Sequence, residues 1–78
     1  MSYLRNKREK SEYTLTSLAN LLGMSKQRLS LIELGKASPT ITQLYLMSVM
    51  LQCDLKELTM HFVKQESELR RYQRKQQA

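Results

Sequence analysis

The sequence has few of the residues that make cross-links, metal sites or catalytic centres. It contains one cysteine, Cys53, and one histidine, His61. A single cysteine cannot form an intramolecular disulfide, and this pair offers no spacing typical of a metal site. The sequence also lacks a nucleophile–base set and a glycine-rich loop. We therefore predict a non-enzymatic protein of a reducing, cytoplasmic compartment, with no metal and no cofactor.

Long apolar runs and aromatic residues are scarce as well. The N-terminal stretch MSYLRNKREKSEY is charged and lacks the apolar core of a signal peptide. No run approaches the roughly 20 apolar residues of a membrane-spanning helix, so we predict no membrane partner. The four tyrosines and one phenylalanine are scattered, which is unlike a stacking platform for single-stranded bases. Two glycines and one proline favour helices over sheet.

Positive charge, in contrast, is in excess. Thirteen Lys and Arg residues against seven Asp and Glu residues give a net charge of +6 on 78 residues. This length makes one small domain, and such an excess favours a polyanionic partner, either nucleic acid or an acidic membrane surface. Charge alone does not choose between the two.

Capping residues and apolar spacing predict five helices. The first is a basic helix over residues 3–11, and Gly23 and Gly35 mark the ends of the second and third. The other four helices have N-caps at Thr14, Ser25, Thr40 and Asp54. We predict an all-α domain over residues 1–63, followed by a basic helical extension over residues 64–78 that frays at its end.

The third helix has an unusual outer face. Leu29 and Ile32, three residues apart, form its inner side. The opposite side and its flanks are polar apart from two leucines, and comprise Lys26, Gln27, Arg28, Ser30, Leu31 and Leu34. Leucines among polar residues on an outer face suggest a contact surface.

The last two helices predict a dimer. Residues 41–51 are uncharged and apolar on nearly every side, so they need cover from the C-terminal segment or from a second chain. The fifth helix shows 3–4 spacing at Leu55, Leu58, Phe62, Gln65, Leu69 and Tyr72. The predicted interface of a homodimer comprises Leu46, Val49, Leu55, Leu58 and Phe62. In the alternative, the fifth helix folds back over the fourth of its own chain.

Over residues 3–58 the sequence resembles the Xre-type helix-turn-helix family, which includes phage Cro proteins and lambda-like repressors. The resemblance rests on Leu18-Ala19, Gly23, Ser25, Ile32-Glu33, Gly35-Lys36, Pro39, Leu55 and Leu58. It implies a five-helix lambda-repressor-like domain whose third helix lies in the DNA major groove. Members of this kind bind as dimers to half-sites about one helical turn, ~34 Å, apart.

The resemblance gives the outer face of the third helix a role. Lys26 can donate to guanine, Gln27 can pair with adenine, and Leu31 can contact a thymine methyl. Together with Ser30, these are the predicted base contacts. The predicted DNA backbone contacts are Thr14, Arg28 and Lys36.

The resemblance also implies an ion pair between Arg8 and Glu33 that fixes the reading helix. Two departures from the family pattern weaken the expected phosphate clamp. Leu15 replaces a common glutamine, and Leu34 replaces a common asparagine. We therefore expect Lys26, Arg28, Lys36 and main-chain N–H groups to compensate.

We predict a dimeric, sequence-specific double-stranded DNA-binding repressor of a pseudo-palindromic operator. Two alternatives remain. One is an antitoxin-like or controller protein that binds a partner protein as well as DNA, and the other is a protein-interaction module that has lost DNA binding. For Cys53 we favour packing between helices over redox switching, and for His61 a solvated side chain over a metal ligand.

Overall fold

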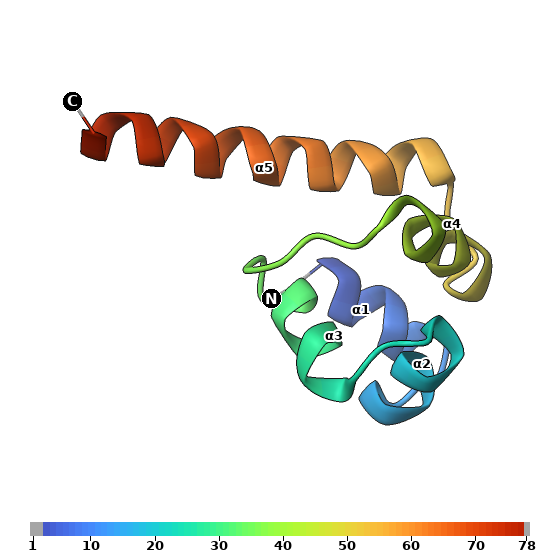
Figure 1. The fold of residues 1–78 in the computed structure, drawn as a ribbon. Helices are drawn as coiled ribbons and strands as arrows, with labels where there is room; N and C mark the ends of the chain where they lie inside the picture. The colour runs from blue at the N-terminus through green and yellow to red at the C-terminus, as the bar shows by residue number, and fades with distance from the viewer. Residues whose placement is uncertain (1–2, 78) are drawn as a thin grey trace.

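The computed structural model describes the backbone of residues 3–77 and the side chains of residues 3–68. These residues form five α-helices and no strand (Figure 1). The helices are α1 (Tyr3–Lys10), α2 (Leu15–Leu22), α3 (Lys26–Glu33), α4 (Ile41–Met50) and α5 (Leu55–Gln77). The predicted all-α, five-helix fold is confirmed.

Side-chain caps start the second, third and fourth helices. Thr14 Oγ1 accepts a hydrogen bond from the Ser17 N–H at 3.1 Å, and Ser25 Oγ accepts one from the Arg28 N–H at 3.1 Å. Thr40 and Gln43 form the predicted capping box. These bonds satisfy N–H groups that have no partner within the helix.

Each of the first four helices ends with a residue of positive φ. These residues are Glu12 (64°), Gly23 (69°), Gly35 (80°) and Gln52 (52°). In each case the next N–H donates to the carbonyl five residues earlier, at distances between 2.9 and 3.1 Å. This hydrogen bond is the signature of the Schellman motif, in which glycine is favoured because it lacks a Cβ. The turn predicted at Gly23 is confirmed, whereas the same conformation at Glu12 and Gln52 was not predicted.

The core joins all five helices. Its buried apolar residues are Leu4, Leu18, Ala19, Leu22, Leu29, Ile32, Met47, Leu51, Leu58 and Phe62. Leu29 and Ile32 are 0% and 1% exposed, so the inner side predicted for α3 is correct. The opposite side of α3 therefore faces away from the core.

The long α5 lies partly on the body and partly beyond it. Leu58 and Phe62 pack into the core, and the helix then continues without a break past residue 63, the predicted domain boundary. Figure 1 shows its C-terminal part projecting past the other helices, and the chain measures 43 × 25 × 24 Å. The side chains of Leu69 and Tyr72, part of the predicted 3–4 pattern, lie outside the described residues. Among the described residues, no helix is both long and apolar enough to cross a membrane.

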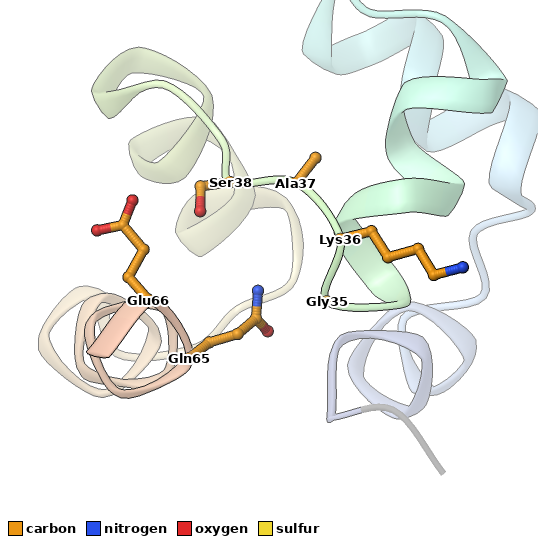
Figure 2. A pocket seen from close by; sticks show the side chains of 6 residues that line it. All are labelled: Gly35, Lys36, Ala37, Ser38, Gln65 and Glu66. Carbon is orange, nitrogen blue, oxygen red and sulfur yellow. The ribbon is translucent and has the colours of Figure 1, made fainter. Parts of the chain in front are cut away.

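A second contact joins α5 to the turn after α3. Gln65 points toward this turn and lies beside Gly35, where an added Cβ would be 3.3 Å from Gln65 Oε1 (Figure 2). A small cavity of about 260 Å³ separates the turn from α5. The side chain of Gln65 on α5 therefore lies close to the α3–α4 connection.

Candidate nucleic-acid interface

The four predicted base-contact residues lie together. Lys26, Gln27, Ser30 and Leu31 line one open hollow on the outer face of α3, and Leu15, the first residue of α2, completes its lining. The hollow has a volume of about 390 Å³. Sequence reasoning treated Leu15 only as a lost phosphate contact. Its place in the hollow follows from the tight turn at Gly23, which folds α2 against α3.

The exposure of these side chains suits contact with a partner. Lys26 and Gln27 are exposed, while Ser30 and Leu15 are half-buried. Leu31 and Leu34 are 44% and 66% exposed. The outer face of α3 therefore presents hydrogen-bond donors, a side-chain amide and apolar surface side by side.

The predicted backbone contacts are not among the residues that line this hollow. Thr14 is exposed at the N-terminus of α2, where its side chain and N–H are engaged by Ser17. Arg28 Nη2 donates to the Ser38 carbonyl at 2.9 Å, so this guanidinium also braces the α3–α4 turn. Lys36 is exposed in the same turn and extends away from α5 (Figure 2). Of the two charged residues, Arg28 and Lys36, only Arg28 donates a side-chain hydrogen bond to the described part of the chain.

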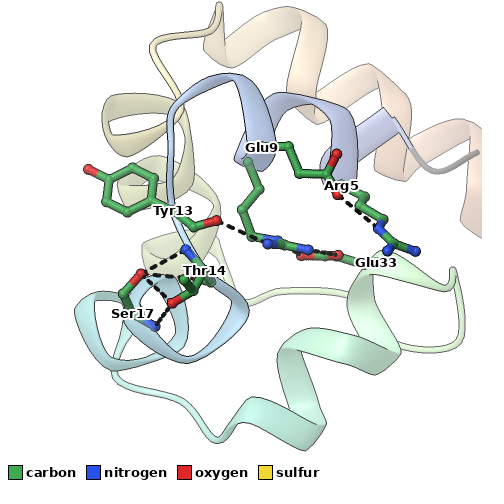
Figure 3. Close-up of polar contacts among 7 residues, drawn as sticks. Arg5, Glu9, Tyr13, Thr14, Ser17 and Glu33 are labelled. Atoms are coloured by element: carbon green, nitrogen blue, oxygen red, sulfur yellow. Dashed lines mark hydrogen bonds and ion pairs between the residues drawn. The ribbon is translucent and has the colours of Figure 1, made fainter.

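Arg8 of α1 forms an ion pair with Glu33, the last residue of α3. Arg8 Nε donates to Glu33 Oε2 at 2.7 Å and Arg8 Nη2 to Glu33 Oε1 at 3.3 Å. Arg8 Nη1 donates to the Tyr13 carbonyl at 3.0 Å. Tyr13 directly precedes Thr14, the residue that caps α2 (Figure 3). The two side chains are only 12% and 8% exposed. One guanidinium thus links the end of α1, the start of α2 and the end of α3, which fixes both helices of the helix-turn-helix unit.

The predicted dimer residues fall into two groups. Leu58 and Phe62 are buried in the core of their own chain, Leu46 is half-buried, and Val49 and Leu55 are 53% and 41% exposed. Leu55 also lines an apolar groove of about 520 Å³ between α4 and α5, together with Ile41, Thr42, Leu44, Tyr45 and Thr59. The sequence pattern did not identify this groove, because it depends on the angle at which α5 leaves α4.

Cys53 and His61 are both partly buried by packing against neighbouring side chains. Cys53 packs against the core, and burial raises the pKa of its thiol, which keeps the thiol protonated and poorly reactive. The His61 ring lies 4.7 Å from the Tyr3 ring and 5.1 Å from the Phe62 ring, and burial lowers its pKa. Over the described residues, no group of three or more His, Cys, Asp or Glu side chains could hold a metal ion. The expectation of a solvated His61 was wrong, because α1 covers part of its ring.

Comparison with known proteins agrees with this geometry. A helix-turn-helix family model matches residues 4–58. No curated protein and no solved structure matches the chain. The match covers α1 to the start of α5, nearly the same stretch as the resemblance seen in the sequence. The chain therefore belongs to the Xre, or lambda-repressor-like, family of helix-turn-helix DNA-binding regulators.

Proposed function

We propose that the protein is a sequence-specific double-stranded DNA-binding repressor that acts as a homodimer on a pseudo-palindromic operator. One observation carries the proposal of base reading: Lys26, Gln27, Ser30 and Leu31 line a single hollow on the outer face of α3. Side chains on one helix face can reach neighbouring base edges in the major groove. The net charge of +6 supplies attraction to phosphate.

Base reading by Gln27 predicts a specific loss. The Gln27→Ala variant lacks the amide, so its affinity for the preferred duplex should fall by about 1–3 kcal/mol, with relaxed preference at one base pair. Fluorescence anisotropy with single base-pair variants of the duplex measures both effects. An unchanged base preference in Gln27→Ala would contradict the assignment.

Phosphate contact by Lys36 predicts a different signature. The Lys36→Ala variant should bind all duplexes more weakly, and its plot of log affinity against log salt should lose about one unit of slope per copy. Lys56→Ala is the matched control, because Lys56 is also exposed but lies on α5. Equal slopes for the two variants would remove Lys36 from the interface.

The dimer is supported by the apolar surface of α4 and α5. Four large side chains of these helices are between 41% and 87% exposed, namely Val49, Leu55, Tyr45 and Ile41. Covering this apolar surface with a second copy of the chain is favourable, because it removes the surface from water. Leu58 and Phe62 already pack within one chain, so their contact with a second copy stays a prediction. The same surface would serve the antitoxin-like alternative, in which a different protein covers it.

Sedimentation velocity at tens of micromolar separates these possibilities. A dimer with a micromolar Kd, or about −8 kcal/mol of association free energy, is the main species in this range. Val49→Asp should shift the chain to monomer, whereas Leu21→Asp, at a similarly exposed leucine of α2, should not. A wild-type monomer would refute the dimer, and co-purification of a second small protein would favour the antitoxin-like alternative. Repression itself is tested by a reporter gene placed behind the selected operator.

A further inference from the structure

The hollow on the α3 face combines two chemistries. Lys26, Gln27 and Ser30 contribute donors and an amide, whereas Leu15 and Leu31 contribute only apolar surface. The two leucines come from different helices, and Leu15 is held in place because it also packs against the core. An apolar wall on a surface otherwise suited to DNA needs an apolar group on the ligand.

Base edges in the major groove offer one such group. The C5 methyl of thymine is the apolar group that stands out there, and the other groups that distinguish the base pairs are hydrogen-bond donors or acceptors. A cytosine methylated at C5 carries the same methyl at the same position. A phosphate or an amino group would gain nothing from the two leucines, because desolvating a polar group without a partner is unfavourable.

We propose that Leu15 and Leu31 form a receptor for the C5 methyl group of a pyrimidine, and that this contact sets sequence preference at one position of each half-site. The inference rests on the proposed DNA-binding function and names the ligand group that its central hollow takes. Leu15 supplies a wall fixed by the α2–α3 turn, and Leu31 supplies the exposed surface that the methyl covers. Lys26 and Gln27 then read the bases beside it.

Uracil substitution tests the proposal directly, because deoxyuridine differs from thymidine only by the missing methyl. The full chain is first used to select its preferred duplex from a random library, and each thymidine of that duplex is then replaced in turn. At one thymidine per half-site, the wild type should bind about four-fold more weakly, which corresponds to ~0.8 kcal/mol for one buried methyl group. A parallel set with 5-methylcytosine at each cytosine shows whether that source of the methyl is also accepted.

Three variants link this methyl effect to the hollow. Leu31→Ala should bind thymidine and deoxyuridine duplexes equally, whereas Leu31→Met should keep most of the four-fold difference. Leu21→Ala, an exposed leucine of α2 outside the hollow, should keep all of it. Leu15→Ala should also remove the difference, and its circular dichroism spectrum checks that the loss of core packing leaves the fold intact.

The outcomes separate the two claims. Sequence-specific binding with no deoxyuridine effect at any position overturns the methyl receptor and leaves the proposed function standing. A deoxyuridine effect that persists undiminished in both Leu15→Ala and Leu31→Ala also overturns it. Binding without any sequence preference overturns the proposed function, and the methyl receptor with it.

Discussion

Replacing Arg8 by methionine removes the cation that holds the helix-turn-helix unit together while keeping most of the side-chain volume. The Glu33 side chain is 8% exposed, and Arg8 donates two hydrogen bonds to its carboxylate. It also stands at the last residue of α3, where the helix dipole disfavours negative charge. The Tyr13 carbonyl loses its guanidinium donor as well.

The expected cost is large for a domain of this size. Stranding one partner of a buried ion pair costs about 3–5 kcal/mol, and a chain of 78 residues has a total stability of about 4–12 kcal/mol. Arg8→Met should therefore lower the melting temperature by at least ~12 °C. Glu33→Gln keeps an oxygen acceptor for Arg8 and should cost less, about 1–3 kcal/mol.

A double-mutant cycle of Arg8→Met, Glu33→Met and the double variant, followed by urea unfolding, measures the coupling. The Arg8→Met/Glu33→Met chain leaves no stranded charge, so it should be more stable than Arg8→Met alone. If Arg8 also positions α3, the double variant should still bind DNA more weakly than the wild type. A cost below ~1 kcal/mol for Arg8→Met, with additive single effects, would refute the assignment of a structural ion pair.

Backbone and titration effects give further predictions. Gly23→Ala should lower the free energy of unfolding by about 1 kcal/mol, because a residue with a Cβ is strained at a φ of 69° even though no atom lies within 4 Å of the added Cβ. Glu12→Gly and Gln52→Gly should raise the free energy of unfolding by up to ~1 kcal/mol, because both residues have positive φ. Thermal melts measure all three effects. The lowered pKa of His61 means that the unfolded chain binds the proton more tightly. The contribution of His61 to the free energy of unfolding should therefore be fully present above about pH 6.5 and should be lost as the pH falls below this value. His61→Gln should flatten this part of the stability–pH curve.

Local signals in the sequence were sufficient to predict the helices and the outer face of α3. Thr14, Ser25 and Thr40 could be identified as caps because their effect acts within three residues of the chain. The inner side of α3 followed from the three-residue spacing of Leu29 and Ile32. The outer face then followed as the side opposite to them.

Features that depend on how helices cross could not be predicted in the same way. Leu15 joins the hollow only because α2 and α3 meet at a particular angle, and Ile41 and Tyr45 line a groove that requires α5 to leave α4 in one direction. The left-handed turns at Glu12 and Gln52 lacked a glycine signal. Nothing in the sequence indicated that His61 is covered, because its contact is with Tyr3, which is far from it along the chain.

The central claim is that the outer face of α3 reads a duplex sequence, and selection of bound duplexes from a random library tests it most directly. We predict an enriched motif with two related half-sites whose centres lie about 10 base pairs apart. The same selection with Gln27→Ala should lose preference at one position of each half-site. A bound pool that stays random in sequence, at a salt concentration where the wild type binds DNA, would contradict the claim.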